Sequence, residues 1–152
     1  MEIIYAYLAG VLDTDGFIHI ACRRGTEHYF ARIGYSDESP VLPELFQEIF
    51  KGRLSRSRPK RSSYSAFYLW EADHRQAREA LSRLLPHLKV KHRQAELALM
   101  LMDTLEREDA GRPVRTPLSI EHAAERRRLY EEVVRLNSAR RRRKHRVEAP
   151  PR

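Results

Sequence analysis

A short acidic run near the start of the chain carries the residues best suited to chemistry. Asp13 and Asp15 lie two residues apart in the run Asp13-Thr14-Asp15-Gly16. Carboxylate oxygens are the ligands that Mg²⁺ and Ca²⁺ prefer. A calcium-binding loop also begins Asp-x-Asp-Gly, but residues 17–20 supply no further oxygen ligands, which argues against such a loop. From this run alone, a helix-terminating turn and part of a metal-dependent catalytic site remain open.

Other metal chemistry finds no support in the sequence. The seven histidines form no HExxH motif, and the single Cys22 cannot pair within the chain, which disfavours zinc and excludes an internal disulfide. The first residues lack the features of a signal peptide, and no apolar run approaches the roughly 20 residues of a membrane-spanning helix. We therefore expect a chain that is not secreted, not embedded in a membrane, and located in the cytoplasm, the nucleoid or an organelle.

The net charge points to a polyanionic partner. The 152 residues carry 29 Lys and Arg against 21 Asp and Glu, a formal charge of +8. Residues 111–152 hold 13 basic and 5 acidic groups, so the excess belongs to this C-terminal part. Residues 51–70 form a second concentration, with six basic residues and no acid. Clustered arginine is typical of nucleic-acid-binding proteins, and a solvated surface with a disordered basic end is the alternative.

Hydrophobic spacing predicts the elements that must position these groups. The expected order is helix, hairpin, helix, hairpin and three helices. The helices are expected over residues 3–12, 39–50, 73–85, 91–107 and 116–136, and the strands over 17–23, 28–35, 53–58 and 65–71. In the second hairpin two interpretations stay open, because Phe67 and Leu69 compete with Tyr68 and Trp70 for the core.

Local signals set several helix boundaries. Asp73 and Gln76 have the spacing of a capping box for the third helix. Asn137 is expected to end the last helix, which makes residues 1–137 a single domain. Residues 138–152 are then a basic tail that is either disordered or in contact with DNA.

These elements predict an α+β fold. Two hairpins that are each followed by a helix favour one antiparallel four-stranded sheet with its helices on one face. Basic and polar residues of the first hairpin then point away from the helices, toward a nucleic acid. They are His19, Arg23, His28 and Arg32.

The run Leu8-Ala9-Gly10-Val11-Leu12-Asp13-Thr14-Asp15-Gly16 resembles the signature of the LAGLIDADG homing endonucleases, differing at Val11, Leu12 and Thr14. Two further segments are similar to family landmarks. Residues 84–95 run from a proline-terminated helix through a basic turn to Gln94-Ala95, and Leu136-Asn137 precedes a basic run. A single signature in this chain is similar to the homodimeric members of the family, whose fold has a saddle-shaped sheet.

The resemblance implies a homodimer whose signature helices pack on each other. Small residues allow close approach of two helix backbones, and Ala6, Gly10 and Thr14 recur every fourth residue with Ala9 beside them. We expect Ala6, Ala9, Gly10 and Asp13 at this interface, with Asp13 as a structural cap. Two Asp15 carboxylates would then meet at the helix ends and hold Mg²⁺, or Mn²⁺ or Ca²⁺, against the scissile phosphates.

The resemblance also implies the other catalytic groups. It places the Thr14 carbonyl on the metal with Asp15, and Lys91 in a basic pocket that stabilises developing charge or orients water. Family members commonly carry a Gln or similar residue where this chain has Asp37. Asp37 is therefore a candidate catalytic residue, and a plain turn residue is the alternative.

These expectations combine into a site-specific endonuclease that hydrolyses both strands of a long pseudo-palindromic double-stranded DNA site. The resemblance implies cleavage across the minor groove with short 3′ overhangs. The alternative is a non-cleaving binder on the same scaffold, either an intron RNA maturase or a transcription regulator. The residues expected to contact DNA are His19, Arg23, Arg24, His28, Arg32, Arg53, Ser55, Arg56, Arg58, Arg61, Tyr68, Trp70, Arg140 and Arg141.

Overall fold

The computed structural model describes residues 1–26, 28–57, 66–109 and 119–148. Its elements follow the predicted order with one short addition after the third helix. The helices are α1 (Glu2–Asp15), α2 (Val41–Phe50), α3 (His74–Leu84), η1 (Leu85–His87), α4 (His92–Asp109) and α5 (Ile120–Glu148). The strands are β1 (Phe17–Cys22), β2 (Tyr29–Asp37), β3 (Arg53–Ser57) and β4 (Phe67–Asp73).

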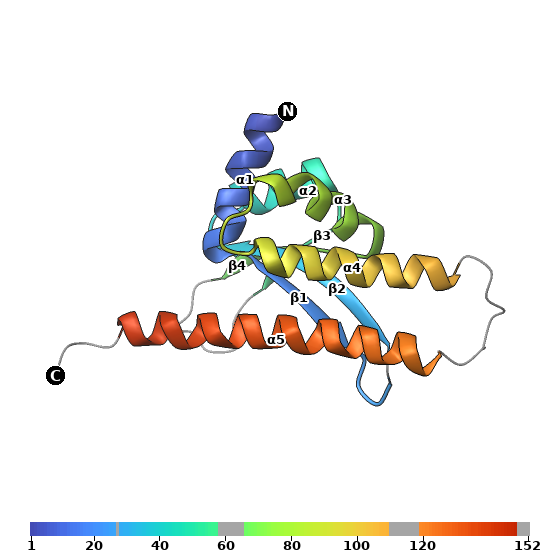
Figure 1. The fold of residues 1–152 in the computed structure, drawn as a ribbon. Coiled ribbons are helices and arrows are strands. Elements are labelled where there is room, and N and C mark those ends of the chain that lie inside the picture. Colours follow the sequence, from blue (N-terminus) through green and yellow to red (C-terminus); the bar gives the residue numbers. More distant parts are fainter. Residues whose placement is uncertain (27, 58–65, 110–118, 149–152) are drawn as a thin grey trace.

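The four strands form one antiparallel sheet in the order β1-β2-β4-β3. The helices gather on one side of this sheet, and α5 runs alongside α4 and β1 (Figure 1). The predicted α+β class, with one antiparallel sheet and its helices on one face, is confirmed. Among the described helices, none combines the length and the apolar character needed to cross a membrane.

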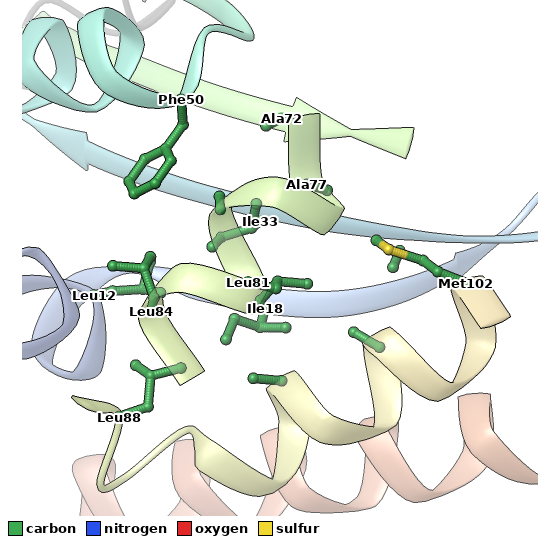
Figure 2. Packing of buried hydrophobic residues seen from close by; sticks show 14 of the residues in the cluster. Leu12, Ile18, Ile33, Phe50, Ala72, Ala77, Leu81, Leu84, Leu88 and Met102 are labelled. Atoms are coloured by element: carbon green, nitrogen blue, oxygen red, sulfur yellow. The ribbon is translucent and has the colours of Figure 1, made fainter. Parts of the chain in front are cut away.

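The core lies between the sheet and the helices. Ile18 of β1 and Ile33 of β2 face Leu12, Leu81 and the other apolar side chains of α1, α3 and α4 (Figure 2). The register pairs Ile18 with Ile33, as the alternation of the first hairpin predicts. Alternation along each strand then leaves the intervening residues on the opposite face of the sheet, which we call the outer face.

The structure decides the ambiguous face of the second hairpin. Trp70 is fully buried, stacks on Phe46 with ring centroids 4.8 Å apart, and donates its indole N–H to the carbonyl of Lys51 at 2.6 Å. Trp70 therefore belongs to the core, and its predicted contact with DNA is wrong. Leu69, which precedes Trp70 in the chain, points to the outer face and is paired with Ser55 of β3 in the sheet register.

The predicted end of the last helix is also wrong. The last helix does not end at Asn137, because this residue contributes to the packing: Asn137 Nδ2 donates to the carbonyl of Ile18 at 3.0 Å, and Gln94 Nε2 donates to Asn137 Oδ1 at 3.4 Å. α5 continues to Glu148, so residues 138–148 are helical rather than a disordered tail. In Figure 1 this part of α5 extends past the rest of the domain.

The predicted capping box of α3 does not form. Asp73 occupies the N-cap position without a side-chain cap bond, because it is still paired with Arg32 in the sheet and its side chain follows the outer face. The chain turns instead at His74, whose φ is 47°.

Candidate functional site

The C-terminal end of α1 separates its two aspartates. Asp13 is turned inward and only 7% exposed, whereas Asp15 is exposed. The two residues are two positions apart on a helix, so their side chains leave it in widely different directions. α1 also runs further than predicted, through Asp15 rather than to residue 12. The two carboxylates therefore have different roles.

The Asp13 carboxylate binds the segment that precedes α4. It accepts hydrogen bonds from the amides of Lys89 at 2.7 Å, Val90 at 3.0 Å and Lys91 at 2.8 Å. Three amides ahead of α4 are thereby satisfied by one charged acceptor. The predicted structural cap is present, and its bonds lie within the chain. A contact of Asp13 with a second copy stays a prediction.

The Lys91 side chain binds the end of α1 in turn. It is 4% exposed, and its ammonium donates to the carbonyls of Leu12 and of Asp13, the latter at 2.8 Å. These carbonyls lie at the C-terminal end of α1, where a helix favours positive charge. Lys91 thus fixes the helix end that carries Asp15, and its expected role in a basic pocket stays a prediction.

Gly16 follows Asp15 because the turn from α1 into β1 is tight. A Cβ at this position would lie 2.9 Å from both Cα and O of Leu12. Gly16 N–H also donates to the Leu12 carbonyl at 3.1 Å. A larger residue here would displace the end of α1, and with it Asp15.

The described groups fit a divalent cation only in part. Asp15 and Thr14 are exposed and offer the carboxylate and carbonyl oxygens that Mg²⁺ and Ca²⁺ prefer. In the described part of one chain, no three His, Cys, Asp or Glu residues lie close enough together to hold a metal ion. A site at Asp15 would therefore need ligands from another molecule, such as a second chain or DNA phosphates.

Asp37 is the last residue of β2, and its carboxylate binds the turn that follows. Its Oδ2 accepts the Tyr35 hydroxyl at 2.9 Å and its Oδ1 accepts the Ser39 amide at 3.1 Å. The Ser39 and Tyr35 hydrogen bonds lower the pKa of Asp37. Burial first, and then the bond to Asp37, raise the pKa of Tyr35 to about 12, with a smaller contribution from the charge of Asp15. The turn role is therefore observed, and a catalytic role for Asp37 stays a prediction.

The outer face of the sheet presents mixed polar and aromatic side chains. His19 pairs with Arg32 across β1 and β2, and the His19 ring stacks on Phe17 with centroids 5.1 Å apart. Burial, followed by the charge of Arg32, lowers the pKa of His19 below 6.5. Arg53 and Ser55 of β3 share this face. His28 and the hairpin residues Arg23 and Arg24 are exposed at its end.

Some predicted contact residues lie elsewhere. Arg56 and Tyr68 pair with each other on the face that Trp70 occupies, with the guanidinium 5.5 Å from the ring centroid. Arg58 and Arg61 lie outside the described residues, and Arg140 and Arg141 lie on the C-terminal part of α5. DNA contact by these residues stays a prediction.

The small residues of α1 are divided between two environments. Ala6, Gly10 and Thr14 are exposed, and nothing lies within 4 Å of the position of a Cβ on Gly10. Ala9 is fully buried in the core of its own chain. Its predicted place at a dimer interface is therefore wrong, because the helix turns it toward the sheet.

Three residues of the outer face are absent from the predicted DNA contacts, namely Phe17, Phe30 and Glu71. Arg32 lies over the ring of Phe30 at 5.3 Å and 3.5 Å from the Glu71 carboxylate. The signal was available, since the alternation that placed His19 and Arg32 outward applies equally to Phe17 and Phe30. The predicted contacts in the first hairpin are His and Arg residues only, so its two outward-facing aromatic rings are not among them.

This sheet and its helices define the fold of the LAGLIDADG homing endonucleases. The intron-encoded archaeal homing endonuclease I-Vdi141I, solved with DNA, superposes with a TM-score of 0.68 at 14% identity, covering 89% of this chain and 84% of that one. I-CvuI in complex with its target gives 0.62 at 19% identity over 89% and 82%. I-SmaMI gives 0.62 at 14% identity over 89% of this chain but only 48% of its own, so this chain corresponds to about half of it. No family model and no curated protein sequence matches the chain. The fold implied by the resemblance is confirmed.

Proposed function

We propose that this protein is a homodimeric, metal-dependent, site-specific endonuclease of double-stranded DNA. The observation that carries the proposal is the exposed Asp15 carboxylate at an α1 end fixed by Asp13 and Lys91. A rigid, charged helix end next to a largely uncovered sheet is suited to hold a metal-bound phosphate in one orientation.

DNA binding is supported by the outer face and by the similar structures. His19, Arg32 and Arg53 present donors on a sheet face that no described helix covers. A two-stranded or larger β-surface can enter the major groove, where base pairs are distinguishable. I-CvuI and I-Vdi141I were solved in complex with DNA.

A divalent cation is supported by the oxygen donors of the α1 end. Asp15 and the Thr14 carbonyl would hold it, and we propose Mg²⁺, with Mn²⁺ or Ca²⁺ able to occupy the same position. When bound, the ion polarises the phosphate and lowers the pKa of a bound water. I-CvuI structures were obtained with Ca and with Mg, the latter with DNA not cleaved.

The dimer is supported by the exposed face of α1. Ala6 and Gly10 leave room for a second backbone, and Ile3 is 87% exposed beside Tyr7 at 52%. An isologous contact along α1 would cover these side chains and place two Asp15 carboxylates near one two-fold axis.

Light scattering tests the dimer and should give about twice the 17.9 kDa chain mass. Gly10→Glu should give one chain mass with an unchanged circular dichroism spectrum.

Binding-site selection followed by cleavage tests the proposal. Protein incubated in Ca²⁺ with randomised duplexes should enrich one long pseudo-palindromic sequence. The enriched duplex should then be cut on both strands in Mg²⁺ or Mn²⁺ and stay intact in EDTA. Failure to enrich any sequence would contradict site-specific binding, and an enriched duplex that stays intact with metal would contradict cleavage.

A further inference from the structure

A carboxylate lies in the middle of the surface assigned to DNA. Glu71 of β4 points to the outer face, where its side chain is 14% exposed. Its Oε2 is 2.7 Å from Arg53 Nη2 and its Oε1 is 3.5 Å from Arg32 Nη1. Arg53 is its direct partner in the β3–β4 register. Glu71 is thus held between two cations that come from different strands.

The surroundings hold this carboxylate in place and leave a small part of it at the surface. Its direct β2 partner is Gly34, which has no side chain, and a Cβ there would clash with the Phe17 ring and lie 2.8 Å from the Trp70 carbonyl. A hollow of about 530 Å³ opens here, and Arg32, Arg53 and Glu71 are among its lining residues. The surface is therefore recessed where the three charges meet.

The chemistry of the three charges restricts what they can recognise. A carboxylate repels phosphate, so Glu71 weakens backbone binding unless it meets a donor. Among base edges in the major groove, the cytosine N4 amino group is a donor that a Glu accepts from, while Arg donates to guanine O6 and N7. A guanidinium carries five N–H donors, and 73% of the Arg53 side chain is exposed, so donors remain at the surface.

We propose that Glu71 and Arg53 together read one G·C base pair in each half of the DNA site, with Glu71 accepting from cytosine and Arg53 donating to guanine. Arg32 holds the carboxylate from the β2 side. This inference rests on the proposed function, because it assumes that the outer face enters the major groove. Glu71 is then a specificity-determining residue rather than a surface ion pair.

Selection from randomised duplexes in Ca²⁺ tests the inference with three proteins: wild type, E71Q and E131Q. E131Q removes the same charge from an exposed residue of α5 and is the matched control. Wild type and E131Q should each enrich the same G·C pair in both half-sites. E71Q should lose about tenfold of the preference at that position and keep the preferences elsewhere.

Each other result has a distinct meaning. If wild type enriches a sequence and E71Q enriches it with the same preferences, or gains affinity for all duplexes equally, the inference is overturned while the proposed function stands. If wild type enriches no sequence, the proposed function fails and the inference with it. A thermal midpoint for E71Q close to that of wild type verifies that both proteins are folded during selection.

Discussion

Asp13 and Lys91 cap each other's helices. The Asp13 carboxylate accepts the Lys91 amide at 2.8 Å, and the Lys91 ammonium donates to the Asp13 carbonyl at 2.8 Å. Both residues are buried, at 7% and 4% exposure. The end of α1 and the start of α4 are therefore one charged, hydrogen-bonded unit, and Asp15 extends from it.

Asp13→Asn should destabilise the fold by about 2 kcal/mol, because a neutral amide accepts less strongly from three backbone amides, one of them buried, and brings an unmatched donor. The measurement is the free energy of unfolding in urea. Glu2→Gln, on the exposed start of the same helix, is the control and should change it by less than about 0.5 kcal/mol. An Asp13→Asn protein as stable as wild type would contradict the capping role.

Lys51 adopts a backbone conformation that suits glycine. Its φ is 60° with ψ of −145°, and its carbonyl is held by the Trp70 indole. Lys51→Gly should be more stable than Lys51→Ala by about 1 kcal/mol, the reverse of the usual order, because only glycine relieves this strain. Both variants remove the side chain, so the Gly–Ala difference in urea unfolding measures the backbone alone. Equal stabilities would contradict the strain.

Asp37 should stabilise the protein in a pH-dependent way. Its folded pKa lies below its ordinary value of 3.8, so its contribution is fully present above that pH and is lost as pH falls through the folded value. Wild type should therefore exceed Asp37→Asn in unfolding free energy at about pH 7, and the gap should shrink toward about pH 3. A gap that is equal at both pH values would contradict the bonds to Tyr35 and Ser39 as its cause.

Arg140 and Arg141 should bind phosphates without reading sequence. Changing both to Gln should weaken binding to all duplexes similarly and reduce the slope of log affinity against log salt by about 1 for each arginine. The measurement is a salt series on the selected duplex and on a scrambled one. A change in sequence preference, or an unchanged slope, would contradict phosphate contact.

The parts of the fold that the sequence predicts well are those with one clear period. In residues 17–23 and 28–35 apolar and polar residues alternate, and the observed register matches. In β4 every position from Phe67 to Trp70 is apolar, so the faces depend on which aromatic residue α2 covers, and Phe46 selects Trp70.

Other failures have a tertiary cause. Asn137 is a common helix-ending residue, yet the carbonyl of Ile18 and the side chain of Gln94 satisfy its amide inside α5. Asp73 has the spacing of a cap, but pairing in the sheet turns its side chain away from α3. Glu71 gave no signal as a single residue, since its position between Arg32 and Arg53 arises only when three strands meet.

The most direct test of the account is Asp15→Asn on the duplex selected by the wild-type protein. The change removes the carboxylate proposed to hold the metal and leaves the outer face unchanged. We predict binding in Ca²⁺ within about threefold of wild type, and double-strand cleavage in Mg²⁺ slower by about a thousandfold or more. Cleavage by Asp15→Asn at the wild-type rate would contradict the central claim.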